Sequence, residues 1–148
     1  MNLSLADKLI IAELLLLFIQ FTVGMWTNLF AIIPKAAFSF TTYSDGAVVL
    51  LHIINGILIF AVAFALIWLS YKSKMSLALK LSVLTAVFVT SAVANGFIFL
   101  RIFYFPAFYN IDNYFSLGMA LSFLASFTTL FAELYMTREI KRLSSADA

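Results

Sequence analysis

The sequence predicts an all-helical integral membrane protein, an antiparallel bundle of four transmembrane helices. Only 11% of the 148 residues are charged, and the mean hydropathy is +1.07. The chain also contains four long stretches without Lys, Arg, Asp or Glu, each long enough for about 30 Å of helix, the thickness of the hydrocarbon core of a bilayer. These stretches are apolar on all sides, whereas a soluble helical domain needs charged faces. The four charge-free stretches are 14–34, 46–71, 81–100 and 113–132.

We expect the four helices at residues 9–33, 46–71, 77–101 and 113–137. Lys8 precedes the first of them, as in a secretory signal, but the apolar run is too long and no A-x-A-like cleavage site follows, so we expect a retained helix. The link between the second and third helices is short, which makes these two helices antiparallel neighbours. No repeat or linker divides the chain, so residues 1–148 are predicted to form a single domain.

The lysines and arginines predict the orientation of the bundle. Seven of the nine lie on one face, namely Lys8, Lys72, Lys74, Lys80, Arg138, Lys141 and Arg142, and only Lys35 and Arg101 lie on the other. The positive-inside rule then places both termini in the cytoplasm and the chain in the cell membrane as a multi-pass protein. The net charge of +2 reflects this orientation and not nucleic-acid binding. Because the chain has no cysteine, disulfides, thiol catalysis and iron–sulfur ligation are excluded.

Polar residues within the spans are candidate functional residues, because they are costly in a membrane. Counting turns from the helix ends places Asn28, His52 and Asn95 at one depth in the outer half of the bundle. Asn55 lies one turn deeper than His52, and Gly56 clears space on the same helix face. We therefore predict a ligand-binding pocket centred on His52. Its candidate residues are Met25, Asn28, His52, Asn55, Asn95 and Met119.

Several occupants suit this predicted pocket. His52 with Met25 or Met119 would give a His/Met haem b site, and four-helix bundles do hold haem between their helices. A quinone headgroup would need only His52 and a neighbouring asparagine, and two copies of His52 could meet in a homodimer. Alternatively, the amides and the imidazole simply hydrogen-bond across helices and hold the bundle together. One histidine does not make a structural metal site, and the sequence contains no complete catalytic motif.

A second polar set lies near the cytoplasmic ends of the spans. Glu13 on the first helix and Glu133 on the fourth are candidate proton or cation sites. In the alternative interpretation, each carboxylate extends to the water or pairs with a nearby cation. The cations in question are Lys8, Lys80 and Arg138.

The segment Ile11-Ala12-Glu13, near the start of a four-span chain, resembles the opening helix of the small multidrug resistance exporters. In that family the membrane glutamate binds drug and protons in turn, so the resemblance implies a proton-coupled small-molecule transporter that uses Glu13. It covers little more than one helix turn. The Gly, Pro and Trp motifs of that family's later helices are not present in this chain.

Two further resemblances concern the predicted pocket. Most of the chain is similar to a set of uncharacterised small four-span prokaryotic membrane proteins, which implies only a fold. The segments that carry this similarity are Gly24-Met25-x-x-Asn28-Leu29-Phe30 with Pro34, His52-x-x-x-Gly56 and Asn113-Tyr114-x-Ser116-Leu117-Gly118-Met119. The segment His52-Ile-Ile-Asn55-Gly56 also resembles a haem-bearing helix of four-helix membrane cytochromes of the b type and of haem A synthase. Those families pair their histidines, whereas this chain has one.

Taken together, these features favour a small subunit or binding module of an electron-transfer or other membrane complex over an enzyme. Its partners would be the lipid bilayer and either another membrane subunit or a second copy of the chain. The alternative function is the proton-coupled transporter using Glu13. Small residues on the fourth helix allow close approach by another helix, from the same chain or from a partner. They are Gly118, Ser122, Ala125 and Ser126.

Overall fold

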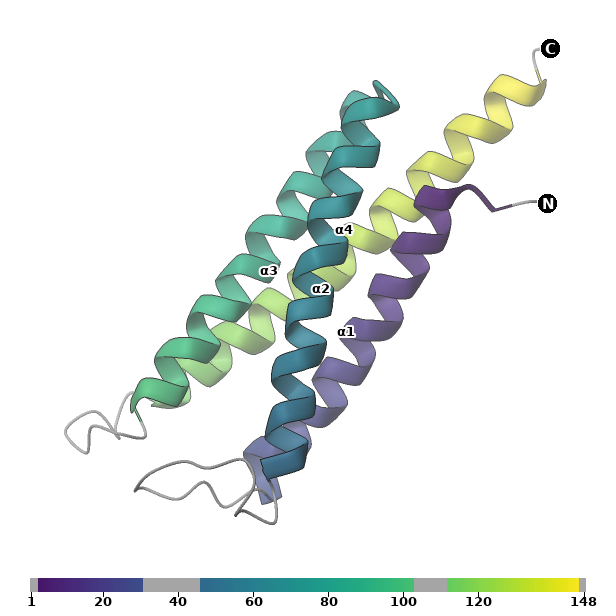
Figure 1. Ribbon diagram of the computed structural model, residues 1–148. Coiled ribbons are helices and arrows are strands. Elements are labelled where there is room, and N and C mark those ends of the chain that lie inside the picture. Colours follow the sequence, from purple (N-terminus) through teal and green to yellow (C-terminus); the bar gives the residue numbers. More distant parts are fainter. Residues whose placement is uncertain (1–2, 31–45, 103–111, 147–148) are drawn as a thin grey trace.

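The computed structural model describes residues 3–30, 46–102 and 112–146, and its secondary structure within them is helical. The helices are α1 (Leu5–Phe30), α2 (Gly46–Lys72), α3 (Ser76–Ile102) and α4 (Asp112–Ala146) (Figure 1). Successive helices run in opposite directions. The start of α1, the end of α4 and the α2–α3 link lie at one end of the bundle, which we call the link end, and the opposite end is called the far end. The predicted four-helix architecture is confirmed.

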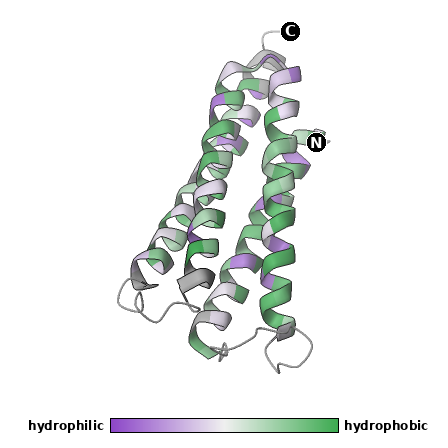
Figure 2. Cartoon of the chain, turned by 60° about the vertical axis from the view of Figure 1, so that its left-hand side comes forward, coloured by the Kyte–Doolittle hydropathy of each residue, from purple (hydrophilic) through white to green (hydrophobic). Residues whose placement is uncertain are grey.

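All four helices are long and apolar enough to cross a membrane. The apolar spans within them are Leu5–Thr27, Gly46–Lys72, Ser76–Ile98 and Tyr114–Ile140. Hydrophobic residues run along the length of every helix (Figure 2), and large side chains such as Phe18, Ile57 and Leu124 are exposed. Such a surface would be unfavourable in water, but it is the ordinary outer surface of a helix in lipid.

Two helices, α1 and α4, extend beyond the expected bounds by more than one residue at one end. The first begins at Leu5 and not at residue 9, because Ser4 and Asp7 form a capping box. Asp7 Oδ2 accepts hydrogen bonds from the Ser4 amide at 3.0 Å and from Ser4 Oγ at 2.7 Å, while Ser4 Oγ accepts from the Asp7 amide at 3.3 Å. The fourth continues to Ala146 and not to residue 137, since the charged residues after the apolar span are good helix formers.

The helices pack in a ring. The α3–α4 interface is the most extensive, α2 packs on both α1 and α3, and the α1–α4 interface is the smallest. Buried residues recur on α1 at Ile10, Glu13 and Leu17, a spacing that places them on one inward face. Glu13 is therefore turned toward the interior of the bundle. The buried hydrophobic core comprises Ile10, Leu17, Ile59, Ala63, Leu66, Ala86, Val89 and Leu130.

The small residues of α4 pack within the chain. Ser122 Oγ donates a hydrogen bond to Ser91 Oγ of α3 over 3.2 Å. A Cβ atom added to Gly118 would lie only 2.7 Å from Asn95 Oδ1, so α3 and α4 approach closely there. At least part of the small-residue face that the sequence left open to a partner helix is thus used in the α3–α4 interface.

Candidate proton and ligand sites

One buried polar cluster takes a side chain from each of the four helices. We call it the carboxyl cluster, and its members are Glu13 of α1, Ser70 of α2, Ser82 of α3 and Glu133 of α4. Their exposed fractions are 0%, 5%, 0% and 1%, respectively. Four oxygen-bearing side chains are therefore shielded together among the apolar spans.

Glu133 is held by two serines. Ser82 Oγ donates to Glu133 Oε1 over 2.7 Å, and Ser70 Oγ lies 3.4 Å from the same oxygen. The two hydroxyl oxygens are also 2.9 Å apart. Glu133 Oε2 is buried without a hydrogen-bond partner. One oxygen of this carboxyl thus lies against the two hydroxyls, whereas the other has no hydrogen-bond partner among the described residues.

Glu13 has no such support. Both of its carboxyl oxygens are buried, and neither has a hydrogen-bond partner in the part of the chain that the structure describes. Glu133 lies close enough for its negative charge to repel a charge on Glu13. An uncompensated carboxylate in an apolar interior is very costly, so Glu13 requires a bound proton or a bound cation. The structure therefore does not show the pairing between Glu13 and a basic side chain that the sequence left open.

The second polar cluster joins α1 and α2. We call it the amide–imidazole cluster, and it consists of Gln20, His52 and Asn55. Asn55 Nδ2 donates to Gln20 Oε1 and to the backbone carbonyl of Leu16, each over 2.9 Å. Gln20 Nε2 lies 3.2 Å from His52 Nε2. The glutamine amide therefore bridges the asparagine and the histidine.

These contacts determine which nitrogen of His52 carries the proton. A backbone carbonyl only accepts, so the Asn55 atom facing Leu16 is the amide nitrogen, which in turn requires the Gln20 oxygen on its other side. The Gln20 nitrogen then faces His52, and an amide nitrogen only donates. His52 Nε2 is consequently the acceptor, and the proton of the neutral ring lies on Nδ1. Nδ1 is buried without a partner.

The imidazole lies against the backbone of α1 at Gly24. A Cβ atom added to Gly24 would be 3.0 Å from His52 Cε1 and 3.5 Å from His52 Nδ1. A larger residue at this position would have to displace the ring. Gly56, which the sequence predicted to be on the same face as His52, lies beside Gln20. A Cβ atom added to Gly56 would be 3.5 Å from Gln20 Nε2.

Two other residues predicted for the pocket, Asn95 and Met119, pack at the α3–α4 interface. Asn95 Nδ2 donates to the Ser91 carbonyl of its own helix over 2.8 Å, at the α3–α4 interface. Met119 packs at the same interface, its sulfur 3.4 Å from the position of an added Gly96 Cβ atom. Met25 is 43% exposed. The side chain of Asn28 lies outside the part of the chain that the structure describes. Hydrogen bonds through Gln20 thus connect His52 with Asn55, whereas the Asn95 amide bonds to a carbonyl of its own helix.

Gln20 was not among the predicted site residues, although it satisfies the same criterion as the asparagines, a polar side chain inside a charge-free stretch. Ser70 and Ser82 were also not predicted. Their sequence signal is weak, because serines in membrane helices commonly bond to the carbonyl four residues before. Ser82 Oγ also lies 2.9 Å from the Ala78 carbonyl, which competes with Glu133 Oε1 for the one hydroxyl proton.

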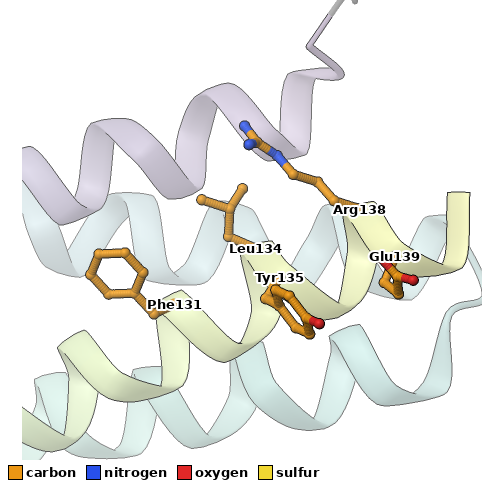
Figure 3. Close-up of a pocket in the computed structure, with 5 residues that line it drawn as sticks. All are labelled: Phe131, Leu134, Tyr135, Arg138 and Glu139. Carbon is orange, nitrogen blue, oxygen red and sulfur yellow. The ribbon is translucent and has the colours of Figure 1, made fainter. Parts of the chain in front are cut away.

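A shallow cavity of about 350 Å³ lies on the surface of α4, near the link end. It is lined by Phe131, Leu134, Tyr135, Arg138 and Glu139, and Figure 3 shows Leu134 and Arg138 extending toward α1. None of these residues belongs to either polar cluster. In the described residues, no three His, Cys, Asp or Glu side chains lie together as metal ligands.

Comparison with protein families, curated proteins and solved structures gives no match for this chain. Its function is therefore inferred from the two polar clusters.

Proposed function

We propose that the protein is a proton-coupled membrane transporter of small molecules in which Glu13 takes up and releases the coupling proton. The observation that carries this proposal is the enclosure of Glu13, which is 0% exposed and has no partner for either oxygen. Intramembrane ionisable residues of this kind characterise proton relays and transport pathways. The resemblance of Ile11-Ala12-Glu13 to the exporter helix supports the same function.

The coupling follows from charge. When the Glu13 proton leaves, the remaining carboxylate needs a compensating positive charge in its apolar surroundings. A lipophilic cation in the same place supplies that charge, so proton and substrate occupy the site in turn. Two ligands that exclude one another at a single site are the minimal requirement for exchange transport.

The proposed orientation places the carboxyl cluster in the cytoplasmic half of the membrane. Lys72, Lys74 and Lys80 lie in or near the α2–α3 link, at the same end as the start of α1 and the end of α4. By the positive-inside rule this end faces the cytoplasm. Glu13 would then receive its proton and its substrate from the cytoplasmic side or release them there.

The test is proton movement in liposomes that contain the purified protein and an internal pH dye. A panel of lipophilic cations should drive proton flux through the wild-type protein, and Glu13→Gln should abolish it while leaving the circular dichroism spectrum unchanged. The amide keeps the size of the side chain but cannot exchange a proton with the site. Glu139→Gln is the matched control, because Glu139 is partly exposed and pairs with Arg142 at 3.4 Å. Equal flux through wild-type and Glu13→Gln liposomes would contradict the proposal.

A second candidate function rests on the buried, unpartnered Nδ1 of His52. In this second function, the protein is a subunit of an electron-transfer complex that binds a quinone. The quinone carbonyl oxygen accepts a hydrogen bond from Nδ1–H of His52. The tautomer favours this ligand over haem b, because His52 Nε2 already accepts a hydrogen bond from Gln20. Opening the site would require the ring to turn away from Gly24.

His52 is the only imidazole in the chain, so isotope-labelled histidine gives the two ring signals of a single residue, Nδ1 and Nε2, in a nitrogen NMR spectrum. We expect this spectrum to show the Nδ1–H tautomer, and a short-chain benzoquinone to shift the Nδ1 signal. Gly24→Ala should alter the signal by displacing the ring, whereas Gly56→Ala should change it little. An Nε2–H tautomer would contradict the hydrogen-bond assignment, and an unchanged Nδ1 signal at saturating quinone would exclude this second function. Haem b would be excluded as the ligand if the visible spectrum of added haem b did not change in the presence of the protein.

A further inference from the structure

We infer that the carboxyl cluster also binds one monovalent metal cation of the sodium type, with ligand oxygens from Glu13, Ser70, Ser82 and Glu133. This inference rests on the proposed function, because it concerns the same Glu13 site. It assigns the serines of α2 and α3 a role as ligands. It also makes Na⁺ a competitor of the proton at Glu13.

The chemistry of the cluster selects a hard cation. Its donors are carboxyl and hydroxyl oxygens, which suit alkali and alkaline-earth ions and not the softer metals that nitrogen and sulfur ligands attract. Three of these oxygens, both of Glu13 and Oε2 of Glu133, are buried without a partner. Since each helix contributes one member, a bound cation would be enclosed from all four sides of the bundle.

The number of oxygens favours a monovalent ion. Ca²⁺ takes six to eight oxygen ligands, and Mg²⁺ retains several waters in most protein sites. Glu133 Oε1 is already engaged by Ser82, which leaves the three unpartnered carboxyl oxygens and the lone pairs of the two serines. This set is small for Ca²⁺, and the buried position is unfavourable for hydrated Mg²⁺.

Charge balance is consistent with exchange between Na⁺ and a proton. With both carboxyls protonated, the cluster is neutral. When one proton leaves Glu13 and one Na⁺ enters, the cluster holds one carboxylate, one carboxylic acid and one cation, and it is neutral again. The exchange therefore buries no net charge, which is the least costly outcome in an apolar interior.

Among the described residues, no basic side chain forms an ion pair with Glu13 or Glu133. On α1, Lys8 is exposed, and Asp7 caps the helix start. On α2, Lys72 lies over the Trp68 ring, 3.9 Å from its centroid. Lys80 of α3 is exposed. Two groups of charged side chains are described on α4 beyond Glu133. The Nε of Arg138 is buried without a partner in the described residues, and Glu139 pairs with Arg142 at 3.4 Å.

The test uses a lipophilic carbodiimide, which adds to protonated carboxyl groups in apolar surroundings, with the adduct located by peptide mass spectrometry. In detergent micelles with choline as the only cation, we expect labelling of Glu13. Added Na⁺ should displace the proton and suppress this labelling at least about tenfold at saturation. Equal labelling in Na⁺ and choline would overturn the inference. Suppression by Ca²⁺ or Mg²⁺ but not by Na⁺ would overturn the monovalent assignment.

Variants of the serines test the ligand set. Loss of a group that only orients a metal ligand typically weakens metal affinity by about tenfold or more. Ser82→Ala removes a ligand oxygen itself, so it should raise the Na⁺ concentration for half-suppression by at least that factor. Ser70→Ala provides a second test should Ser82→Ala fail to fold. Thr128→Ala is the control, since Thr128 is exposed and donates to the Leu124 carbonyl of its own helix over 2.8 Å. Identical Na⁺ dependence in the serine variants and the control would exclude the serines as ligands. The two proposals can fail separately. If Glu13→Gln abolishes proton flux but Na⁺ does not suppress carbodiimide labelling of Glu13, the transporter function stands and only the sodium site is excluded.

Discussion

Glu13→Met is expected to increase the stability of the protein, by about 1–3 kcal/mol in the free energy of unfolding. The carboxyl of Glu13 is fully buried and its two oxygens have no hydrogen-bond partner, so the folded state bears their desolvation cost. Met has a similar length and no strongly polar atoms, and its flexible chain adapts to an irregular interior.

The measurement is the thermal or denaturant unfolding midpoint in detergent, followed by circular dichroism. Glu139→Met is the control, because the pair of Glu139 and Arg142 lies at the surface and contributes little. We expect the control to change stability by less than about 0.5 kcal/mol. A Glu13→Met protein less stable than the wild type would show that the carboxyl makes a favourable contact in the folded state.

The same substitution should abolish the proton flux proposed for the wild type. A residue whose replacement increases stability and removes activity is maintained for function, because the folded chain would be more stable without it. A structural carboxyl would show the opposite result, with lower stability and unchanged flux. Measuring both quantities on one variant therefore separates the two roles of Glu13.

The fold was predictable because a membrane span imposes a strong length and composition requirement. Four apolar stretches without charges allow four helices and little else. The helix ends were less predictable, since the apolar stretch marks the hydrocarbon thickness and not the end of the helix. Thus α4 extends to Ala146 through charged residues, and the Ser4 capping box starts α1 before its apolar run.

The sequence predicted the site residues by their depth along the helices, and depth does not determine rotation about the helix axis. Counting residues from the helix ends placed Asn95 at the level of His52, but level alone does not determine which neighbour a side chain faces. In the structure Asn95 faces Gly118 of α4, while His52 faces Gln20 and Gly24 of α1. Each helix is apolar on nearly all sides, so no polar stripe in the sequence reveals its inward face.

Gly118→Ala is expected to destabilise the protein, whereas Gly56→Ala is expected to be neutral or stabilising. An alanine Cβ at position 118 would lie 2.7 Å from Asn95 Oδ1 and 3.0 Å from Asn95 Cγ. Asn95 is short and its Nδ2 is bound to the Ser91 carbonyl at 2.8 Å, so it can avoid the clash only by losing that bond or by separating α3 from α4. We expect a cost of about 1–3 kcal/mol, the usual penalty for overpacking.

The same change at Gly56 meets only an ordinary contact, 3.5 Å from Gln20 Nε2, and gains up to about 1 kcal/mol from the better helix propensity of alanine. Asn95→Ala should rescue Gly118→Ala, because it removes the atoms with which the new Cβ collides. Unfolding midpoints of the two single variants and the double variant would give a coupling energy of about 1 kcal/mol or more for residues in contact. Additive effects of Gly118→Ala and Asn95→Ala would mean that α3 and α4 do not approach as closely as the structure shows, and that Asn95 is free to face the His52 side of the bundle.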